Sequence, residues 1–259
     1  METGIRINKY LSERGICSRR EADRLLEEGR IRVNGKAAVQ GQRVDPGDNI
    51  QIDGEHIAVK KNRETEPVVL AFNKPRGIVC TTVSQDDSVN IVDYINYKTR
   101  IFPIGRLDKD SEGLILLTNV GELVNEINRS RNHHEKEYVV TCSRKINDEF
   151  LHKMSDGVVI AVPARNTEKG FMRDGKLYKN VKTAKCEIKR IDDRTFSITL
   201  TQGLNRQIRR MCEACGYKVV KLKRIRIMNI RLKDLPEGRF RELSKDEVAE
   251  LRSGTKRIY

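Results

Sequence analysis

Apolar and polar positions in the first sixty residues follow the periods of two short helices and a small sheet. Ser18–Glu21 has the pattern of a capping box, which predicts that a helix begins there. The apolar residues of this helix share one face, and Gly29 supplies a C-terminal stop. The residues of that face are Ala22, Leu25 and Leu26. We therefore expect a short amphipathic helix after the segment INKYLSERG, which itself predicts a first helix.

Turn signals divide the next part of this unit into strands. Asn34-Gly35 stands between RIRV and KAAV and predicts a two-residue hairpin. Asp45–Asp48, with the sequence DPGD, predicts a turn that leads into NIQI. Residues 1–60 are thus expected to form a small domain in which two helices lead into a sheet.

A charged segment without apolar residues follows, and we expect residues 61–66 to be an exposed linker. Residues 67–259 mix strand-like runs with helix-like segments but do not alternate them regularly. The strand-like runs are VVLAF, KEYVVTC, TAKCEIKRI and TFSITLT, and the helix-like segments are Gly121–Arg129, Asp148–Met154 and Asn205–Ala214. This pattern predicts an α+β domain built on a mixed, mainly antiparallel sheet.

The composition and the apolar stretches argue against a membrane protein or an exported protein. Hydrophobic residues make up 37% of the 259, and the longest apolar stretches, Val68–Phe72 and Leu114–Leu117, are too short to span a membrane. The opening METGIRINKYLSERG lacks the apolar region of a signal peptide, so we expect a cytoplasmic protein of bacterial type with no membrane partner. Six scattered cysteines in a chain of this size suggest reduced thiols.

The charge balance points to a polyanionic partner. The chain has 51 Lys and Arg against 37 Asp and Glu, a net charge of +14. Residues 203–233 hold ten basic residues and a single acidic one, Glu213. Residues 1–60 are nearly balanced, with eleven basic and ten acidic residues. We therefore expect a polyanion or an acidic surface as the partner, contacted mainly through residues 203–233.

The densest polar cluster is GRLDKDSEG, at Gly105–Gly113, between the apolar runs IFPI and LILLT. It can be a solvated acidic turn or a functional loop. A calcium loop is excluded because Asn119 stands where a bidentate Glu is required. HHEKEY has Tyr138 in place of the second zinc-binding histidine, and Cys212-x-x-Cys215 has no second ligand pair nearby. We expect neither a metal nor, without a Walker loop or GxGxxG run, a nucleotide cofactor.

Four ordered motifs carry a family resemblance. They are NKPRGIV (73–79), PIGRLDKDSEGLILLT (103–118), KEYVV (136–140) and GLNRQIRRMCEACGYKVVKLKRIRI (203–227). Together they resemble the RsuA/RluF branch of ribosomal RNA pseudouridine synthases, and the RluF subgroup most closely. The segment LSERGICSRREADRLLEEGRIRVNGK resembles a small RNA-binding domain that also occurs in a small-subunit ribosomal protein.

The resemblance implies a reaction without a cofactor, in which the glycosidic bond of a uridine is cut and the base is rejoined through carbon 5. Asp108 matches the essential aspartate, acting in ionised form as nucleophile or as base. Arg209 matches the cation that holds it ionised, and Tyr138 the tyrosine that packs on the base. Arg106 matches the residue that fills the gap left by the flipped uridine.

Further residues are expected around this site. Asp110 and Glu112 are interpreted as surface or turn residues, and Lys74 as a brace for the catalytic loop. The residues expected to lie at the bound RNA in this domain are Lys74, Asn205, Arg206, Gln207, Arg210 and Arg224. In the first domain the predicted RNA-facing patch is Arg14, Arg19, Arg20 and Arg24. Only 5% of residues are aromatic, which favours recognition of shape and phosphates over broad base stacking.

The expected function is isomerisation of a specific uridine in ribosomal RNA, in a stem-loop of 23S ribosomal RNA, by a monomeric enzyme. Two alternatives stay open. The same chemistry can act on 16S ribosomal RNA or a tRNA, or the chain can be a non-catalytic RNA-binding factor of ribosome assembly in which the Asp108 loop is structural.

Overall fold

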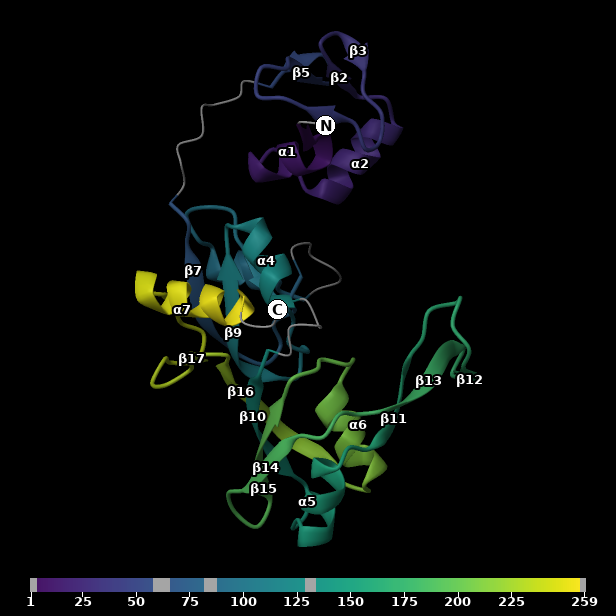
Figure 1. The fold of residues 1–259 in the computed structure, drawn as a ribbon, viewed down its shortest axis with the longest axis vertical. Helices are drawn as coiled ribbons and strands as arrows, with labels where there is room; N and C mark the ends of the chain where they lie inside the picture. The colour runs from purple at the N-terminus through teal and green to yellow at the C-terminus, as the bar shows by residue number, and fades with distance from the viewer. Residues whose placement is uncertain (1–3, 58–65, 82–87, 129–133, 257–259) are drawn as a thin grey trace. The chain divides into compact units, whose positions relative to one another are not determined.

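The computed structural model describes residues 4–57, 66–81, 88–128 and 134–256. The chain divides into two compact units, residues 1–66 and 67–259, which are treated one at a time below (Figure 1). Except for Glu66, the predicted linker 61–66 lies outside the described residues.

The first unit begins with two helices, α1 (Ile7–Glu13) and α2 (Arg19–Glu27). Ser18 caps α2, because its hydroxyl oxygen accepts a hydrogen bond from the backbone N–H of Glu21 at 3.0 Å. The Glu21 carboxylate bonds instead to Arg24 on the next turn. The capping box is therefore formed by its serine half, and the apolar face predicted for α2 is buried as expected.

A four-stranded sheet and a two-stranded sheet complete this unit. The hairpin at Asn34-Gly35 is confirmed, and both residues have positive φ, 51° and 78°. The larger sheet has the order β3-β2-β5-β6, and β1 pairs with β4. The strands are β1 (Ile5–Arg6), β2 (Ile31–Val33), β3 (Lys36–Ala37), β4 (Arg43–Val44), β5 (Ile50–Ile52) and β6 (Glu55–His56).

The second unit is built on a mixed sheet in which most pairings are antiparallel, as predicted. The strand order is β14-β15-β10-β16-β9-β7-β18, with β8 on β9 and β17 on β16. Only β9 and β16 run parallel among the described strands of this sheet. The strands are β7 (Val69–Lys74), β8 (Phe102–Ile104), β9 (Glu112–Thr118), β10 (Lys136–Cys142), β14 (Glu187–Arg190), β15 (Thr195–Leu200), β16 (Val219–Ile227), β17 (Ile230–Arg231) and β18 (Phe240–Glu242).

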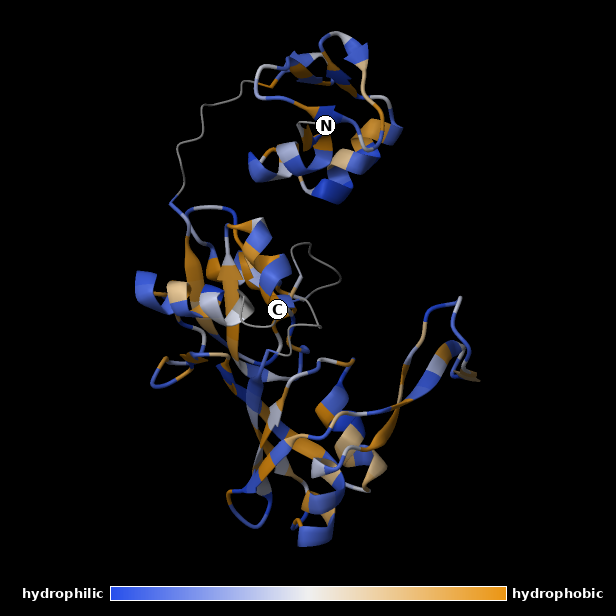
Figure 2. Ribbon diagram, viewed as in Figure 1, coloured by the Kyte–Doolittle hydropathy of each residue, from blue (hydrophilic) through white to orange (hydrophobic). Residues whose placement is uncertain are grey.

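Helices cover this sheet, and the most apolar strands lie beneath them (Figure 2). The three predicted helices are present, although α6 starts two residues late because Arg206 adopts a left-handed conformation with φ 52°. The helices of this unit are α3 (Ile91–Ile95), α4 (Gly121–Asn128), α5 (Asp148–Ser155), α6 (Gln207–Ala214) and α7 (Lys245–Lys256). None of the described helices is both long and apolar enough to cross a membrane.

A second, three-stranded sheet extends away from the main sheet (Figure 1). Its order is β11-β13-β12, with β11 (Val159–Pro163), β12 (Phe171–Arg173) and β13 (Lys176–Lys182). The sequence pattern gave no prediction for it. Its β12 is exposed at all three residues, so hydrophobic periodicity carries little signal there.

The parallel junction of β9 and β16 depends on a glycine. Gly113 pairs with Arg224 and has φ +102°. A Cβ at this position would lie 2.3 Å from the carbonyl oxygen of Arg224. Any larger residue must therefore separate the two strands as well as adopt an unfavourable backbone conformation.

We predict that Gly113→Ala destabilises the fold by about 3 kcal/mol or more, because steric overlap adds to backbone strain. Gly175→Ala is the matched control, since its φ of +69° is also positive but the space around it is open. The control should cost only about 1 to 2 kcal/mol. Thermal unfolding measures both, and equal losses for the two variants would contradict the predicted overlap.

Candidate active site

The Asp108 loop joins β8 to β9 and is held by a buried lysine. Lys74, at the end of β7, is fully buried, and its ammonium donates to the carbonyl oxygens of Ser111 at 2.8 Å and Pro75 at 2.9 Å. Burial lowers the pKa of Lys74, partly opposed by Cys80 and Asp108 nearby. The structure thus gives Lys74 the bracing contacts that the sequence suggested, and it leaves no room for a direct RNA contact.

Asp108 is about one third exposed, and its carboxylate lies 3.6 Å from the guanidinium of Arg206. The expected pairing with Arg209 is not formed. Arg209 contacts Asp110 instead: its Nε forms an ion pair with the carboxylate at 3.3 Å, and its Nη2 donates a hydrogen bond to the backbone oxygen at 2.9 Å. The Asp108–Ser111 turn, closed by a backbone hydrogen bond of 3.0 Å, places Asp110 between Arg209 and the catalytic candidate.

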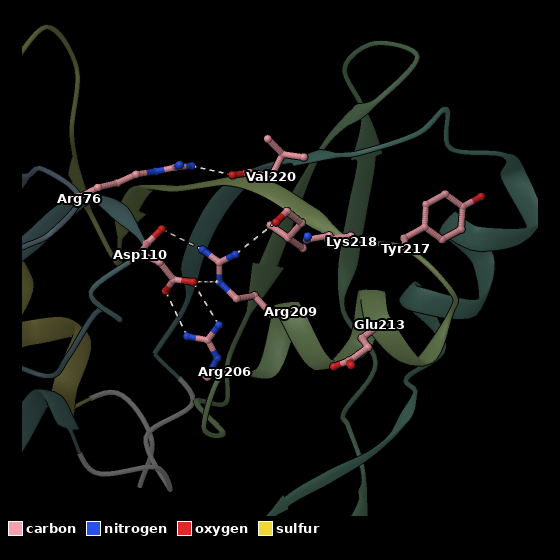
Figure 3. A pocket seen from close by; sticks show the side chains of 9 residues that line it. Arg76, Asp110, Arg206, Arg209, Glu213, Tyr217, Lys218 and Val220 are labelled. Atoms are coloured by element: carbon pink, nitrogen blue, oxygen red, sulfur yellow. Dashed lines mark hydrogen bonds and ion pairs between the residues drawn. The ribbon is translucent and has the colours of Figure 1, made fainter.

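Asp110 is an exposed turn residue, as expected, and it is also the centre of a charge network. Arg206 donates to both of its carboxylate oxygens at 3.1 Å, while Arg209 approaches from the next turn of α6 (Figure 3). Partial burial alone would raise the pKa of Asp110. The hydrogen bond from Arg206 and the charge of Arg209 outweigh this effect and hold the pKa below its ordinary value.

A cavity of about 530 Å³ opens beside this network. Four cationic side chains and two carboxylates line it, so it carries a net positive charge. They are Arg76, Arg206, Arg209, Lys218, Asp110 and Glu213. The net positive charge of this lining would attract a phosphate of an RNA strand.

Glu112 also differs from expectation, because it is 8% exposed rather than a surface residue. Its carboxylate pairs with Arg76 at 3.4 Å and with Lys221 at 3.2 Å. These two bonds join the start of β9 to β16 and to the segment after β7.

Tyr138 lies on β10 opposite Arg224 of β16, and its partly buried side chain packs against two apolar clusters of the unit. One of these clusters includes Leu107, the neighbour of Asp108. The guanidinium of Arg224 lies 5.9 Å from the Tyr138 ring. The structure therefore brings Tyr138 to the same part of the sheet as the Asp108 loop.

Arg224 is not the RNA contact that we expected, because it is only 3% exposed. Its Nε donates to the carbonyl oxygen of Leu114 at 2.6 Å and its Nη1 to that of Arg106 at 3.5 Å. Its Nη2 is buried and has no hydrogen-bond partner among the described residues. Arg224 thus braces β9 and the catalytic loop. The side chain of Arg106 itself is exposed, as the assigned gap-filling role requires.

Lys136 is a residue that sequence reasoning missed, although it lies in the KEYVV motif. It lies two residues before Tyr138 on β10, so both side chains share one face of the strand. Burial, followed by the positive charge of Arg224, lowers the pKa of Lys136 to about 8. The alternation of side chains along a strand places Lys136 on the same face as Tyr138, and this was the sequence signal that could have identified Lys136.

Three of the expected RNA contacts on and before α6 form hydrogen bonds within the protein itself. Gln207 is 4% exposed and bonds to Gln202 and to the backbone N–H of Leu204. Arg210 donates to Ala161 and to Asn205, and so also engages the side chain of Asn205. Arg206, by contrast, is exposed at the cavity.

Acidic residues from other segments neutralise much of the basic stretch 203–233. Five of its ten cations pair with carboxylates that lie between residues 110 and 137. These pairs are Arg206 and Arg209 with Asp110, Lys221 with Glu112, Arg226 with Glu135 and Glu137, and Arg231 with Glu137. The local excess that the sequence suggested is therefore much smaller in the folded protein.

The predicted arginine patch of the first unit is smaller than expected. Arg19 and Arg20 are exposed and have no ion pair among the described residues. Arg24 pairs with Glu21 and with Glu28 on its own helix. The guanidinium of Arg14 lies 3.5 Å from the ring centroid of Tyr10.

Within the described part of the chain, no group of three or more His, Cys, Asp or Glu side chains is arranged to hold a metal ion. The six cysteines are all free in the structure.

We predict that the low pKa of Lys136 makes stability depend on pH. The unfolded chain binds this proton up to about pH 10.5, whereas the folded chain loses it near pH 8, so the free energy of unfolding should rise between these values. Lys136→Met should remove this part of the rise. Urea unfolding of both proteins from pH 7.5 to 10.5 measures the difference, and parallel curves would contradict it.

Comparisons with known proteins agree with this geometry. Residues 68–214 match the profile of a family described as RNA pseudouridylate synthase, and residues 5–50 match the S4 domain. The dual-specificity RNA pseudouridine synthase RluF of Escherichia coli K12 is 50% identical over 251 residues, which cover 96% of this chain and 79% of that protein.

More distant relatives span the same two units. Ribosomal large subunit pseudouridine synthase B of Bacillus subtilis is 35% identical over 256 residues, covering 96% of each chain. A crystal structure of a pseudouridylate synthase superimposes with a TM-score of 0.64 at 27% identity, covering 95% of this chain and 99% of that one. The chain belongs to the RNA pseudouridine synthase family, with an S4 domain ahead of the synthase domain.

Proposed function

We propose that this protein isomerises a specific uridine of 23S ribosomal RNA to pseudouridine, with Asp108 as the catalytic carboxylate. The observation that carries this proposal is the position of Asp108. It lies on a loop braced by a buried lysine, beside an arginine at 3.6 Å and next to a cationic cavity. The cation stabilises the negative charge that either a nucleophile or a base requires.

The remaining groups fit the steps of the reaction. Once the glycosidic bond is broken, the freed base has to turn within the site before carbon 5 bonds to the ribose. The partly buried ring of Tyr138 offers a surface on which the base can pack. Arg106, exposed beside Asp108, can occupy the space that the flipped nucleotide leaves in the RNA stack.

The target RNA is inferred from the relatives. The Bacillus subtilis relative is named for the large ribosomal subunit, which supports a 23S target. The relatives named RluF are described as dual-specificity enzymes, which supports a second RNA target, and a tRNA or 16S ribosomal RNA is the alternative to test. Residues 1–60 would bind the RNA as a small domain, joined by the linker 61–66 to the catalytic domain 67–259.

In this proposal Arg19 and Arg20 contact the RNA backbone from α2, because they are the exposed cations of the predicted patch that have no ion pair among the described residues. The enzyme acts as a monomer, since one chain contains the aspartate, the tyrosine and the arginines. It works in the cytoplasm, where ribosomal RNA is assembled into particles.

Asp108→Asn tests the catalytic assignment. The amide keeps the shape of the side chain but can neither attack the ribose nor accept its proton. Isomerisation of a 23S ribosomal RNA stem-loop should fall at least about 10⁴-fold, while RNA affinity stays within about twofold. Single-turnover pseudouridine formation and filter binding measure the two quantities. A variant with the wild-type rate would exclude Asp108, and wild-type modification of only 16S ribosomal RNA or tRNA would exclude the 23S target.

Asp110→Asn tests the charge network of Asp110, Arg206 and Arg209 separately from the catalytic role of Asp108. It removes the carboxylate that holds Arg206 and Arg209, so we expect the single-turnover rate to fall by about 10- to 100-fold. RNA affinity at low salt should increase, because two cations lose their acidic partner. Asp193→Asn removes an exposed carboxylate paired with Lys145 elsewhere and serves as the control. Unchanged rate and affinity in Asp110→Asn would contradict the role of this network.

A further inference from the structure

We propose that Lys136 contacts the uracil base during the reaction, and that its ammonium donates a hydrogen bond to a carbonyl oxygen of the base. In this role Lys136 stabilises the negative charge that the base carries once its bond to the ribose is broken. The inference rests on the proposed function, because it takes a uridine beside Asp108 and Tyr138 as the substrate. It adds a catalytic residue on β10 to the aspartate, the tyrosine and the arginines.

The acids next to Lys136 in the sequence are paired elsewhere. Glu135 and Glu137 both form ion pairs with Arg226, at 3.0 Å and 2.8 Å. Side chains alternate along β10, so Lys136 lies on the face opposite to Glu137 and shares its own face with Tyr138. Lys136 has no carboxylate partner among the described residues. Its charge is therefore not neutralised by the strand that carries it.

The surroundings of Lys136 are apolar. Leu200 of β15 and Ile227 of β16 lie directly opposite it on the two neighbouring strands, and both are buried. Residues that face each other across an antiparallel pair lie on the same side of the sheet. Burial among such neighbours lowers the pKa of Lys136 to about 8. An unpaired cation in apolar surroundings costs stability, and groups of this kind are typical of functional sites.

The ammonium of Lys136 has protons to spare for a ligand. It donates to the carbonyl oxygen of His134 at 3.3 Å, which is its one hydrogen bond among the described residues. An ammonium carries three donor protons. Lys74 differs, because it bonds to the carbonyl oxygens of Ser111 and Pro75 at 2.8 Å and 2.9 Å. Lys74 is thus used within the protein, whereas Lys136 can donate to a bound base.

Other buried polar atoms beside Lys136 have no hydrogen-bond partner among the described residues. They are Nε2 of His134, a residue that is only 5% exposed, and Nη2 of Arg224. The guanidinium of Arg224 lies 5.9 Å from the ring centroid of Tyr138. Burial lowers the pKa of His134, and the positive charge of Lys136 lowers it further. Because unpartnered buried polar atoms are uncommon in folded proteins, two of them here indicate that a polar ligand binds at this place.

The charges at this place favour an anion. The charged or titratable groups that act on Lys136 or respond to it among the described residues are Arg224 of β16 and His134. Neither of them is acidic. The ring of Tyr138 and the apolar face of the sheet suit a flat base better than a hydrated phosphate. The ligand that fits is therefore a base that becomes negatively charged.

The reaction produces such a base. When the bond between N1 of uracil and C1′ of the ribose breaks, its electron pair stays with N1, and the charge spreads over the carbonyl oxygens. A hydrogen bond from an ammonium stabilises this anion more than the neutral base. The base then turns, carbon 5 forms the new bond to C1′, the proton on carbon 5 leaves and N1 gains a proton. Lys136 keeps its own proton throughout.

Lys136→Met tests the contact. The single-turnover rate at saturating RNA should fall roughly 100-fold or more, because a hydrogen-bond donor to the developing charge is lost. RNA affinity should stay within about twofold, since the contact strengthens only as the base becomes charged. Lys136→Arg keeps the charge and should retain most of the rate. Lys189→Met is the control, because it removes an exposed lysine of the same sheet that pairs with Glu187.

Thermal unfolding near neutral pH verifies that the variants are folded. Lys136→Met should be at least as stable as wild type, because it removes a charge from apolar surroundings. Lower RNA affinity with an unchanged rate would overturn the inference, in favour of a phosphate contact.

The pH dependence of the rate separates a catalytic role from a structural one. At saturating RNA the wild-type rate should decrease above about pH 8, as Lys136 loses its proton. Lys136→Met should lack this decrease, and Lys136→Arg should move it to higher pH. Single-turnover rates from about pH 6.5 to about pH 9.5 measure the three profiles. Identical profiles in wild type and Lys136→Met would overturn the inference.

The outcomes distinguish this inference from the proposed function. If wild type forms no pseudouridine in any RNA, the proposed function fails and this inference fails with it. If Asp108→Asn is inactive while Lys136→Met keeps the wild-type rate, the inference alone is overturned. If wild type modifies only 16S ribosomal RNA or a tRNA, a slow Lys136→Met on that RNA supports the inference although the 23S target is wrong.

Discussion

The parallel contact of β9 with β16 is the constraint on which the site depends. At this contact Gly113 lies against the backbone of Arg224, and no side chain fits between them. The close approach lets Arg224 reach back to Leu114 and to the start of the catalytic loop. It also brings the acidic loop 108–112 against the basic segment that runs from α6 into β16.

Because of this contact, many cations of residues 203–233 are paired with carboxylates in the folded protein. Residues 203–233 have a large positive excess in the sequence, but acids from the Asp108 loop and from the start of β10 pair with half of the cations. Many of these cations hold the site together. In the proposed function, RNA affinity comes from particular cations that have no ion pair among the described residues, such as the cavity residue Lys218 and Arg19 and Arg20 of α2.

Local features of the fold could be predicted from the sequence, because they depend on neighbouring residues. The Asn34-Gly35 hairpin, the Ser18 cap and the three predicted helices of the second unit follow from turn chemistry, capping and the helical period. The mixed sheet could be predicted because strand-like and helix-like segments do not alternate regularly along the sequence. The three-stranded sheet β11-β13-β12 was missed because β12 is short and fully exposed, so its residues show no alternation.

The residues of the candidate site could be predicted from the sequence, but the ion pairs that they form could not. Asp108, Tyr138 and Arg206 lie in motifs whose family resemblance pointed to them. The exchange of partners, with Asp110 bonding to Arg209 and Arg206 lying nearer to Asp108, depends on a turn and a helix start almost one hundred residues apart. The burial of Glu112, Gln207 and Arg224 likewise reflects tertiary packing that a single sequence does not encode locally.

The central claim is that this protein converts a ribosomal RNA uridine to pseudouridine through Asp108. The most direct measurement is a chemical map of pseudouridines across total RNA from a strain that lacks the gene, complemented with either the wild-type or the Asp108→Asn protein. The account predicts that a pseudouridine in 23S ribosomal RNA disappears on deletion and returns only with wild type. An unchanged map, together with a ribosome-assembly defect that either protein repairs, would contradict it.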